Sequence, residues 1–279
     1  MIVTRIISPA GTAHAFRDGL AAVYRNRALI AHMTRRELRD RHAGQMLGVA
    51  WAICAPLLVM ATYVFTFTFI FQQRLGIDDT GHGYTAYVLA GLVPWLAMSD
   101  VLSRAPSAVS GSASLVKQIV FPSEVLPLKV ALASLMQLLV GLAVVALLSL
   151  LAGRLSMQAL LLLPLALLLY VLIMAGFAYV LAAIGVFVKD VREIVSFLMS
   201  IGLFLHPILY APASTPHWLM PLFHSSPMSH VIWCFRDALI ESSVVHPWSW
   251  LVASLFAGLI FATGWRFFRM LQPSFGNAL

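Results

Sequence analysis

Long apolar runs constrain this chain most, because a segment of about 20 apolar residues can cross a lipid bilayer as a helix. Six such runs follow one another: residues 49–71, 84–103, 130–152, 159–188, 194–210 and 248–268. The fourth run is long enough to tilt or bend at Pro164, and the fifth is short and contains Pro207. The sequence therefore predicts an all-α integral membrane protein with six transmembrane helices.

The composition supports a membrane protein. Of the 279 residues, 61% are hydrophobic and 10% are charged, whereas a soluble domain carries about 25% charged residues. Cys54 and Cys234 are far apart in the sequence and belong to no CxxC motif. This spacing predicts neither a disulfide framework nor a zinc site, and we expect both cysteines to be buried thiols.

Basic residues are concentrated on one side of the predicted helices. Of the 18 lysine and arginine residues, only Arg74, Arg154 and Arg236 fall in the connections of the side opposite the two termini. Loops that stay in the cytoplasm carry the excess of positive charge. The distribution predicts a multi-pass protein with both termini in the cytoplasm.

A basic segment precedes the first apolar run. Residues 35–42 hold four arginines and two acids. No aromatic residue interleaves with these charges, which argues against nucleic-acid binding. We expect an amphipathic helix that lies on the membrane surface, attracted by anionic lipid at about 1 kcal/mol per basic residue. The two acids argue against a face that binds lipid alone, so a protein partner remains an alternative.

Motifs for nucleotide, metal and hydrolase chemistry are missing. The three lysines, at positions 117, 129 and 189, do not follow a glycine, so the phosphate-binding loop G-x-x-x-x-G-K-[ST] does not occur. No HExxH or GxSxG motif occurs either, and the histidines of residues 211–247 lack ligand spacing. We expect no catalytic residue, no metal and no cofactor in this chain.

Few charges fall within the apolar runs. Asp100 and Arg104 are four residues apart near the end of the second run, and we expect them to neutralise each other. His206 is the one deep titratable group, and no acid shares its run. The lack of buried carboxylate partners argues against a proton-coupled transporter.

Seven motifs occur in a characteristic order. They are LGVAWAICAPLL (47–58), YVLAGLVPWLAMSDVLSR (87–104), SLVKQIVFPSEVLPL (114–128), VKDVREIV (188–195), HPILY (206–210), SPMSHVIWCFRDAL (226–239) and the tail FFRMLQPSFGNAL. Over residues 34–279 this order resembles the permease subunits of ABC-2 type polysaccharide-exporting ABC transporters. The sequence departs from that pattern at His206, where a small hydroxyl residue is common, and at Ser226, where asparagine is common.

The resemblance implies a partner assembly and a substrate. The implied assembly is a homodimer of permeases in the bacterial inner membrane with two separate ATP-binding subunits, which hold ATP and Mg²⁺. The implied substrate is a lipid-linked polysaccharide, with O antigen preferred to a capsular or teichoic-acid polymer. A membrane-embedded polymer-modifying enzyme and a secondary transporter remain alternatives. The implied domains are a cytoplasmic segment at 1–48, a transmembrane domain at 49–268 and a cytoplasmic tail at 269–279.

The resemblance implies that the connection between the second and third runs contacts the ATP-binding subunit. Breakers surround a short predicted helix within residues 105–125, and the connection is too apolar for a plain solvated loop. The candidate contact residues are Leu115, Lys117, Gln118, Phe121 and Glu124, joined by Arg35, Glu37 and Arg39 of the amino-terminal helix.

The resemblance implies that residues 211–247 form an external gate. Irregular backbone cannot face lipid, because unpaired amides cost several kcal/mol each there. We therefore expect two short helices, at residues 217–223 and 227–240, that re-enter the outer half of the membrane. An amphipathic pair resting on the membrane surface is the alternative. The candidate gate residues are His217, Trp218, His230, Trp233 and Arg236.

Aromatic residues of the first run are candidates for the transport path. On a helix, Tyr63, Phe67 and Phe71 form one stripe, and Phe65 and Phe69 form another. Sugar rings stack their apolar faces on aromatic side chains, so one stripe is a plausible inner wall. The candidate lining residues are Tyr63, Thr66, Phe67, Phe71, Trp95 and His206. Contact of all these rings with lipid is the alternative.

Overall fold

The computed structural model describes residues 9–70, 82–117, 121–154, 157–210, 217–241 and 243–279. Within these ranges the regular structure is helical, and no strand occurs. The α-helices are α2 (Pro9–Arg25), α3 (Arg27–Asp40), α4 (Trp51–Phe65), α5 (His82–Arg104), α6 (Ala113–Val116), α7 (Val125–Leu151), α8 (Ala159–Phe187), α9 (Val191–Leu205), α10 (Met220–Ser225), α11 (Pro227–Leu239), α12 (Pro247–Leu271) and α13 (Phe275–Ala278).

Among the described residues, five helical segments are long and apolar enough to cross a membrane. They are Gly48–Ile70, Gly83–Ser107, Val125–Leu151, Leu161–Phe187 and Pro247–Ala278. These segments confirm a multi-pass membrane protein and correspond to five of the six predicted runs. The remaining run forms α9, which has 15 residues. At 1.5 Å per residue, α9 is about 22 Å long and falls short of a hydrocarbon core of about 30 Å.

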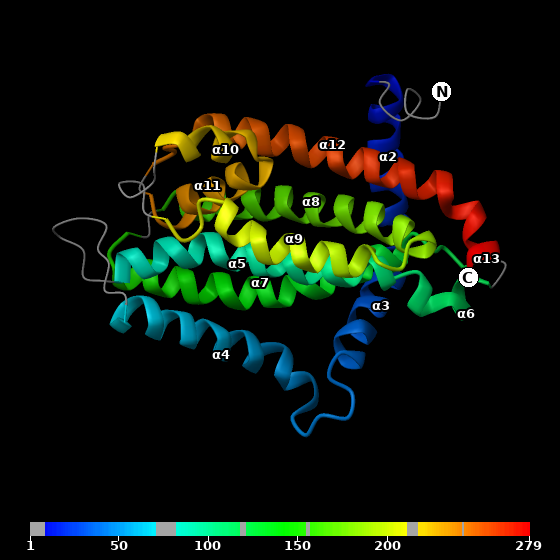
Figure 1. The fold of residues 1–279 in the computed structure, drawn as a ribbon, viewed down its shortest axis with the longest axis horizontal. Helices are drawn as coiled ribbons and strands as arrows, with labels where there is room; N and C mark the ends of the chain where they lie inside the picture. The colour runs from blue at the N-terminus through cyan, green and yellow to red at the C-terminus, as the bar shows by residue number, and fades with distance from the viewer. Residues whose placement is uncertain (1–8, 71–81, 118–120, 155–156, 211–216, 242) are drawn as a thin grey trace.

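The long helices lie side by side, and α9 runs in the same bundle against α5 and α8 (Figure 1). At one end of the bundle, on the right of Figure 1, lie α6 and α13, and α2 and α3 cross the long helices close by. We call this the α6 end. At the opposite end, which we call the α11 end, lie α10 and α11. The long helices therefore alternate in direction between two chemically different ends.

Glycines allow α8 and α12 to pack most closely. A Cβ on Gly176 would lie 2.6 Å from the carbonyl carbon of Ile260, and a Cβ on Gly264 would overlap the carbonyl group of Gly176. Small residues let two helix backbones approach where larger side chains would hold them apart. This crossing positions α12 against the centre of the bundle.

The amino-terminal segment forms two helices, whereas the sequence predicted one. The basic residues 35–42 overlap α3, which packs on α7, and the additional helix α2 packs across α12. Gly19 permits this second crossing, since a Cβ there would lie 2.9 Å from the Phe261 ring. Both helices lie across the bundle axis (Figure 1), which is the direction expected for helices on a membrane surface.

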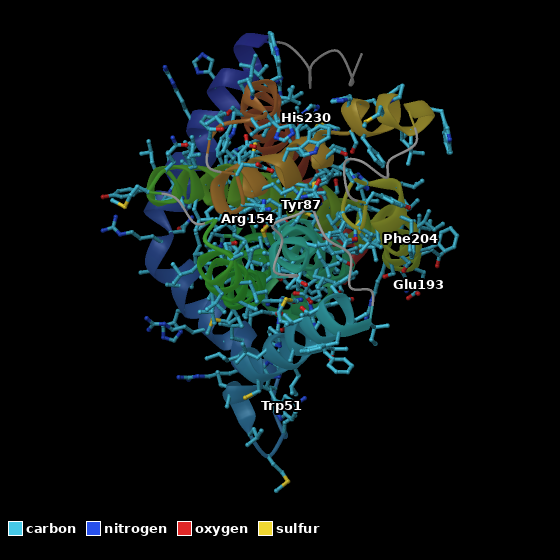
Figure 2. The ribbon with its side chains drawn as sticks, turned by 90° about the vertical axis from the view of Figure 1, so that its left-hand side faces the viewer. Trp51, Tyr87, Arg154, Glu193, Phe204 and His230 are labelled. Carbon is cyan, nitrogen blue, oxygen red and sulfur yellow. The ribbon has the colours of Figure 1, made fainter. Side chains whose placement is uncertain are left out.

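The helix α4 stands apart from the other long helices. Only 6% of the apolar stretch around α4 is buried, against 83% of the stretch around α5. Viewed from the α11 end, Tyr87 of α5 lies near the centre of the molecule and Trp51 of α4 lies at its edge (Figure 2). Most of the α4 surface is therefore left for lipid or another protein to cover.

Candidate functional site

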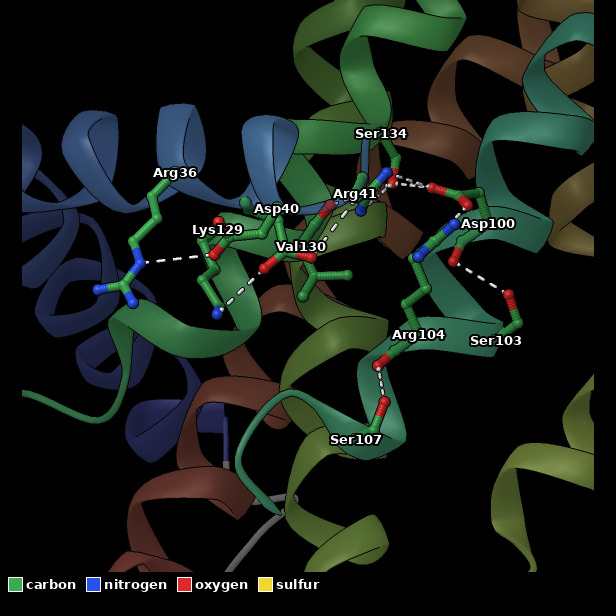
Figure 3. A network of polar contacts seen from close by, with 11 residues as sticks. Arg36, Asp40, Arg41, Asp100, Ser103, Arg104, Ser107, Lys129, Val130 and Ser134 are labelled. Carbon is green, nitrogen blue, oxygen red and sulfur yellow. Dashed lines mark hydrogen bonds and ion pairs between the residues drawn. The ribbon is translucent and has the colours of Figure 1, made fainter. Parts of the chain in front are cut away.

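Asp100 is the centre of a polar network at the α6 end (Figure 3). Its Oδ2 accepts hydrogen bonds from Arg41 Nη1 at 2.9 Å and from Ser134 Oγ at 2.5 Å, and its Oδ1 accepts one from Arg104 Nε at 2.7 Å. Arg41 caps α3, Asp100 and Arg104 belong to α5, and Ser134 belongs to α7. One carboxylate therefore joins three helices.

The network continues along α3. Glu37 lies 3.5 Å from Arg41 Nε and 3.1 Å from Lys129 Nζ of α7. The predicted pair of Asp100 and Arg104 is thus present, but a second arginine shares the carboxylate. The spacing of Glu37 and Arg41, four residues apart on one helix face, predicts a pair between these two residues but not the contact of Arg41 with Asp100. Nothing local in the sequence pointed to Ser134.

The connection between α5 and α7 brings candidate contact residues from two segments together. Leu115 of α6 and Glu37 of α3 both line a pocket of about 300 Å³. The other residues of this pocket are Met33, Arg36, Asp40, Gly111, Ser112, Ser114 and Lys129. A partner side chain that entered the pocket would contact both segments at once.

The remaining candidates of this connection differ in exposure. Lys117 is exposed, as are Arg35 and Arg39 of α3. Phe121 instead packs against an internal apolar cluster, and Glu124 is 5% exposed. Gln118 lies outside the described residues. The accessible candidates at the α6 end are therefore Leu115, Lys117 and the charged face of α3.

Arg236 of α11 is the largest fully buried side chain, with 1% of its surface exposed. Its Nη1 donates to the Tyr87 hydroxyl at 2.9 Å, its Nε to the Tyr87 carbonyl at 3.3 Å and its Nη2 to the Ile208 carbonyl at 3.1 Å. The guanidinium carbon also lies 3.6 Å from the centre of the Tyr87 ring. Arg236 thus joins α11 to α5 and to the segment that follows α9.

Histidines surround Trp233 at the α11 end. The Trp233 ring stacks on His246, with centroids 5.4 Å apart, and His246 Nδ1 lies 2.8 Å from Asp237 Oδ1. His230, labelled in Figure 2, packs edge-on against Trp233, and its Nδ1 lies 3.0 Å from Ser249 Oγ. Burial lowers the pKa of His230 below its ordinary value. Among the described residues, no group of three or more His, Cys, Asp or Glu is arranged to hold a metal ion.

The other two predicted gate residues lie before α10. Trp218 is 78% exposed. His217 begins a short 3₁₀ segment, His217–Leu219. The helical elements of this region, His217–Leu219, α10 and α11, closely match the two helices expected at residues 217–223 and 227–240. The two parts of this region differ in burial: every residue of α11 from Ser229 onward is buried, whereas Trp218 is exposed.

His206 ends α9 and contacts two other helices. Its Nε2 lies 2.9 Å from Ser226 Oγ, its Nδ1 lies 2.6 Å from the Gly202 carbonyl oxygen, and its ring centroid lies 4.6 Å from that of Trp95. The two positions at which the sequence departs from the family pattern therefore face each other. Trp95 is 3% exposed and covers Gly202. Trp95 is therefore buried inside the protomer in this conformation, whereas His206 is half-buried.

Two aromatic stripes run along α4 and the π-helical turn Thr66–Ile70 that follows it. Tyr63 stacks on Phe67 with centroids 6.3 Å apart, and Phe67 packs edge-on against Tyr84 of α5. Phe65 and Phe69 form the other stripe, 56% and 62% exposed. The stripe assigned to the path therefore faces α5, and the alternative stripe faces outward.

The other two candidates of this region have different positions. Thr66 is half-buried and donates its hydroxyl to the Thr62 carbonyl at 2.8 Å. Phe71 lies outside the described residues.

Comparison with known proteins identifies relatives over most of the chain. The family model described as ABC-2 type transporter matches residues 28–240. The O-antigen export system permease protein RfbA of Myxococcus xanthus is 31% identical over 193 residues, which are 69% of this chain and 72% of that protein. A protein of the same name from Klebsiella pneumoniae is 23% identical over 253 residues, 90% of this chain and 95% of that protein.

Proposed function

The chain belongs to the ABC-2 type transporter family, and from this premise we propose that it is the permease of a polysaccharide exporter in the bacterial inner membrane. The observation that carries the proposal is its similarity, over most of both chains, to permeases named for O-antigen export. We therefore propose a lipid-linked O antigen as the polymer. The chain acts as a transport subunit, and ATP and Mg²⁺ bind to a separate ATPase.

The assembly that we propose is a homodimer of permeases with two ATP-binding subunits. The absence of a phosphate-binding loop in the sequence supports a separate motor. The exposed surface of α4 supports a second copy, because it is a nearly continuous apolar face that its own protomer leaves uncovered. The α6 end, which is rich in basic residues, faces the cytoplasm in this arrangement. With α9 as a short sixth pass, both termini lie on that side.

The coupling contact lies at the α6 end. We propose that the ATPase contacts Leu115, Lys117 and the charged face of α3, including Arg35, Glu37 and Arg39. The pocket shared by Leu115 and Glu37 supports a joint contact. Movement of α3 would then pass to α5 and α7 through the Asp100 network, whose hydrogen bonds are short. Phe121, which packs against an apolar cluster, and the buried Glu124 would support this contact from within. Gln118 stays a proposed contact residue.

The transport path and its outer gate follow from the remaining candidates. Tyr63 and Thr66 of the candidate lining residues are half-buried on α4 and the turn that follows it, beside the exposed rings of Phe65 and Phe69. Aromatic faces without charges would let a long polymer slide without tight binding at any one point. Phe67 and Trp95 are buried and would join the path only if their own protomer opened around them, whereas His206 is half-buried. At the outer end, α10 and α11 form the gate, held by Arg236 and the residues around Trp233.

The proposed function is tested by deleting the gene in a producing strain and measuring surface polymer and cell-associated lipid-linked polymer separately. We expect surface polymer to disappear while full-length polymer of unchanged composition accumulates inside, because synthesis precedes export. Complementation with Lys117→Glu should restore little export, since the exposed Lys117 cation would attract a complementary acidic partner and the introduced carboxylate would repel it. Arg154→Glu, at the opposite end, is the control and should restore export.

Two outcomes would contradict the proposal. Polymer that still reaches the surface with an altered structure would identify a modifying enzyme. Export that persists when ATP is depleted and the proton gradient is held would identify a secondary transporter. Protein level in the membrane is measured for each variant, so that a loss of export is not a loss of protein.

A further inference from the structure

A pocket of about 450 Å³ lies between α2 and α12, and Glu124, at the end of the connection between α5 and α7, also lines it. Its basic residues come from two helices, with Arg25 on α2 and Arg266 and Arg269 on α12. The other lining residues are His14, Ala15, Asp18, Ala21, Ala22, Glu124 and Trp265. The volume falls within the range of about 300–1,000 Å³ that is typical of small-molecule sites.

The charges of the pocket favour an anion. Glu124 is 5% exposed and is engaged by Arg269 Nη1 at 3.9 Å and by Gln272 Nε2 at 3.5 Å. Arg269 also lies over the Trp265 ring, 5.9 Å from its centre. The three arginines of the pocket, Arg25, Arg266 and Arg269, outnumber its two acids, Asp18 and Glu124. Guanidinium groups bind phosphate oxygens in paired, charge-assisted hydrogen bonds.

The position of the pocket indicates which kind of molecule carries that anion. Trp265, Arg266 and Arg269 fall in the last turns of α12, where an apolar membrane segment meets its first charges. Tryptophan and arginine in this order are typical of the headgroup region. The helix α2 crosses α12 there and adds alanines to one wall. A ligand held in the pocket would keep its charge at the arginines and its apolar part beside the bilayer.

We propose that this pocket binds the headgroup of an anionic membrane phospholipid, with Arg25 and Arg266 as the phosphate ligands and Arg269 held beside them by Glu124. Bound lipid would fix α2 against α12 and so set the position of the amino-terminal helices on the membrane surface. This site goes beyond export, since its phosphate ligands, Arg25 and Arg266, are not among the residues proposed to contact the polymer or the ATPase.

The test uses the purified full-length chain in detergent and dihexanoyl phosphatidylglycerol as the probe, with binding followed by the shift in thermal unfolding temperature. The double variant Arg25→Gln/Arg266→Gln should bind at least about tenfold more weakly, because two charge-assisted hydrogen-bond donors are lost. Ala21→Trp keeps every charge but fills the pocket, and it should weaken binding about as much. Arg17→Gln, on the exposed surface of α2 outside the pocket, is the matched control and should bind normally.

Two further probes identify the source of the phosphate. Dihexanoyl phosphatidylcholine has the same chains without net charge, and inorganic phosphate has charge without chains. We expect both to bind at least about tenfold more weakly than phosphatidylglycerol. Equal binding of either probe would overturn the assignment to an anionic lipid. Unchanged phosphatidylglycerol binding in the Ala21→Trp variant would overturn the site, even if the double arginine variant did not fold.

Discussion

Single polar residues join segments of this protein that are far apart in the sequence. Asp100 connects α3, α5 and α7, and Arg236 connects α11 to α5 and to the segment after α9. His206 and Ser226 join the end of α9 to the start of α11. Around such groups little water is available to replace a lost partner, so removal of one group leaves its partner unsatisfied.

At this scale we predict the effect of Asp100→Asn. The amide removes the negative charge shared by Arg41 and Arg104, so the free energy of unfolding should fall by about 1–3 kcal/mol. The measurement is thermal unfolding in detergent, with Asp190→Asn at an exposed position as the control.

A double variant tests whether this loss comes from the network. Arg41→Gln added to Asp100→Asn should cost less than the sum of the two single changes, because both remove the same contact. Strict additivity would show that Arg41 and Asp100 act separately.

Close helix crossings set the arrangement at the scale of elements. The helices α8 and α12 meet at Gly176 and Gly264, and α2 meets α12 at Gly19. In each case the missing Cβ is what allows the contact, since the neighbouring helix occupies its place. The helix α4 has no comparable crossing among the described residues and stays at the edge of the bundle.

We predict that Gly264→Leu destabilises the protein, whereas Gly258→Leu on the same helix does not. Leucine at 264 would overlap the Gly176 backbone, and overpacking costs about 1–3 kcal/mol. No atom lies within 4 Å of a Cβ built on Gly258. Leucine has a higher helix propensity than glycine, so Gly258→Leu should leave stability unchanged or raise it slightly. The yield of monodisperse protein and its unfolding temperature measure both effects. Similar values for the two variants would contradict a close crossing at Gly264.

The whole molecule presents an uneven surface to its surroundings. Five apolar helical segments can cross the membrane, yet the burial of these segments ranges from 6% to 83%. On α4, Leu58 and Phe65 are 59% and 56% exposed, and they lie on one face because seven residues make about two turns. Lipid alone could cover this face, but the proposed homodimer assigns it to a second copy.

If α4 forms the dimer interface, substitutions on α4 should weaken the dimer, whereas matched substitutions on α8 should not. Leu58→Gln/Phe65→Gln on α4 should raise the dissociation constant of the purified protein at least about tenfold, because two apolar contacts at the interface are lost. Leu161→Gln/Leu168→Gln on α8 is the control, since these leucines are also exposed and equally spaced. Mass measurement by light scattering in detergent reports the oligomer. An unchanged dimer in the α4 variant would assign that face to lipid.

Sequence alone determined the elements, because the length and composition of an apolar run depend only on neighbours along the chain. In the described part of the chain, five apolar runs form helices of membrane-spanning length near their predicted bounds. The helix α11 begins at Pro227, as expected. The family could also be read from motif order. The length of α9 and the existence of α2 were harder to predict from the sequence, because a short or mildly amphipathic helix produces a weak periodic signal.

Only the tertiary structure decided which side chains meet. Apolar periodicity shows that a helix has a buried face, but it does not show which neighbour covers that face. From the sequence, Trp95 is a candidate lining residue, but in the structure α9 covers its ring at Gly202. The candidates Arg236 and His206 gain their partners, Tyr87 and Ser226, only when α11 packs between the long helices. These contacts join residues far apart in the chain, so no local pattern could specify them.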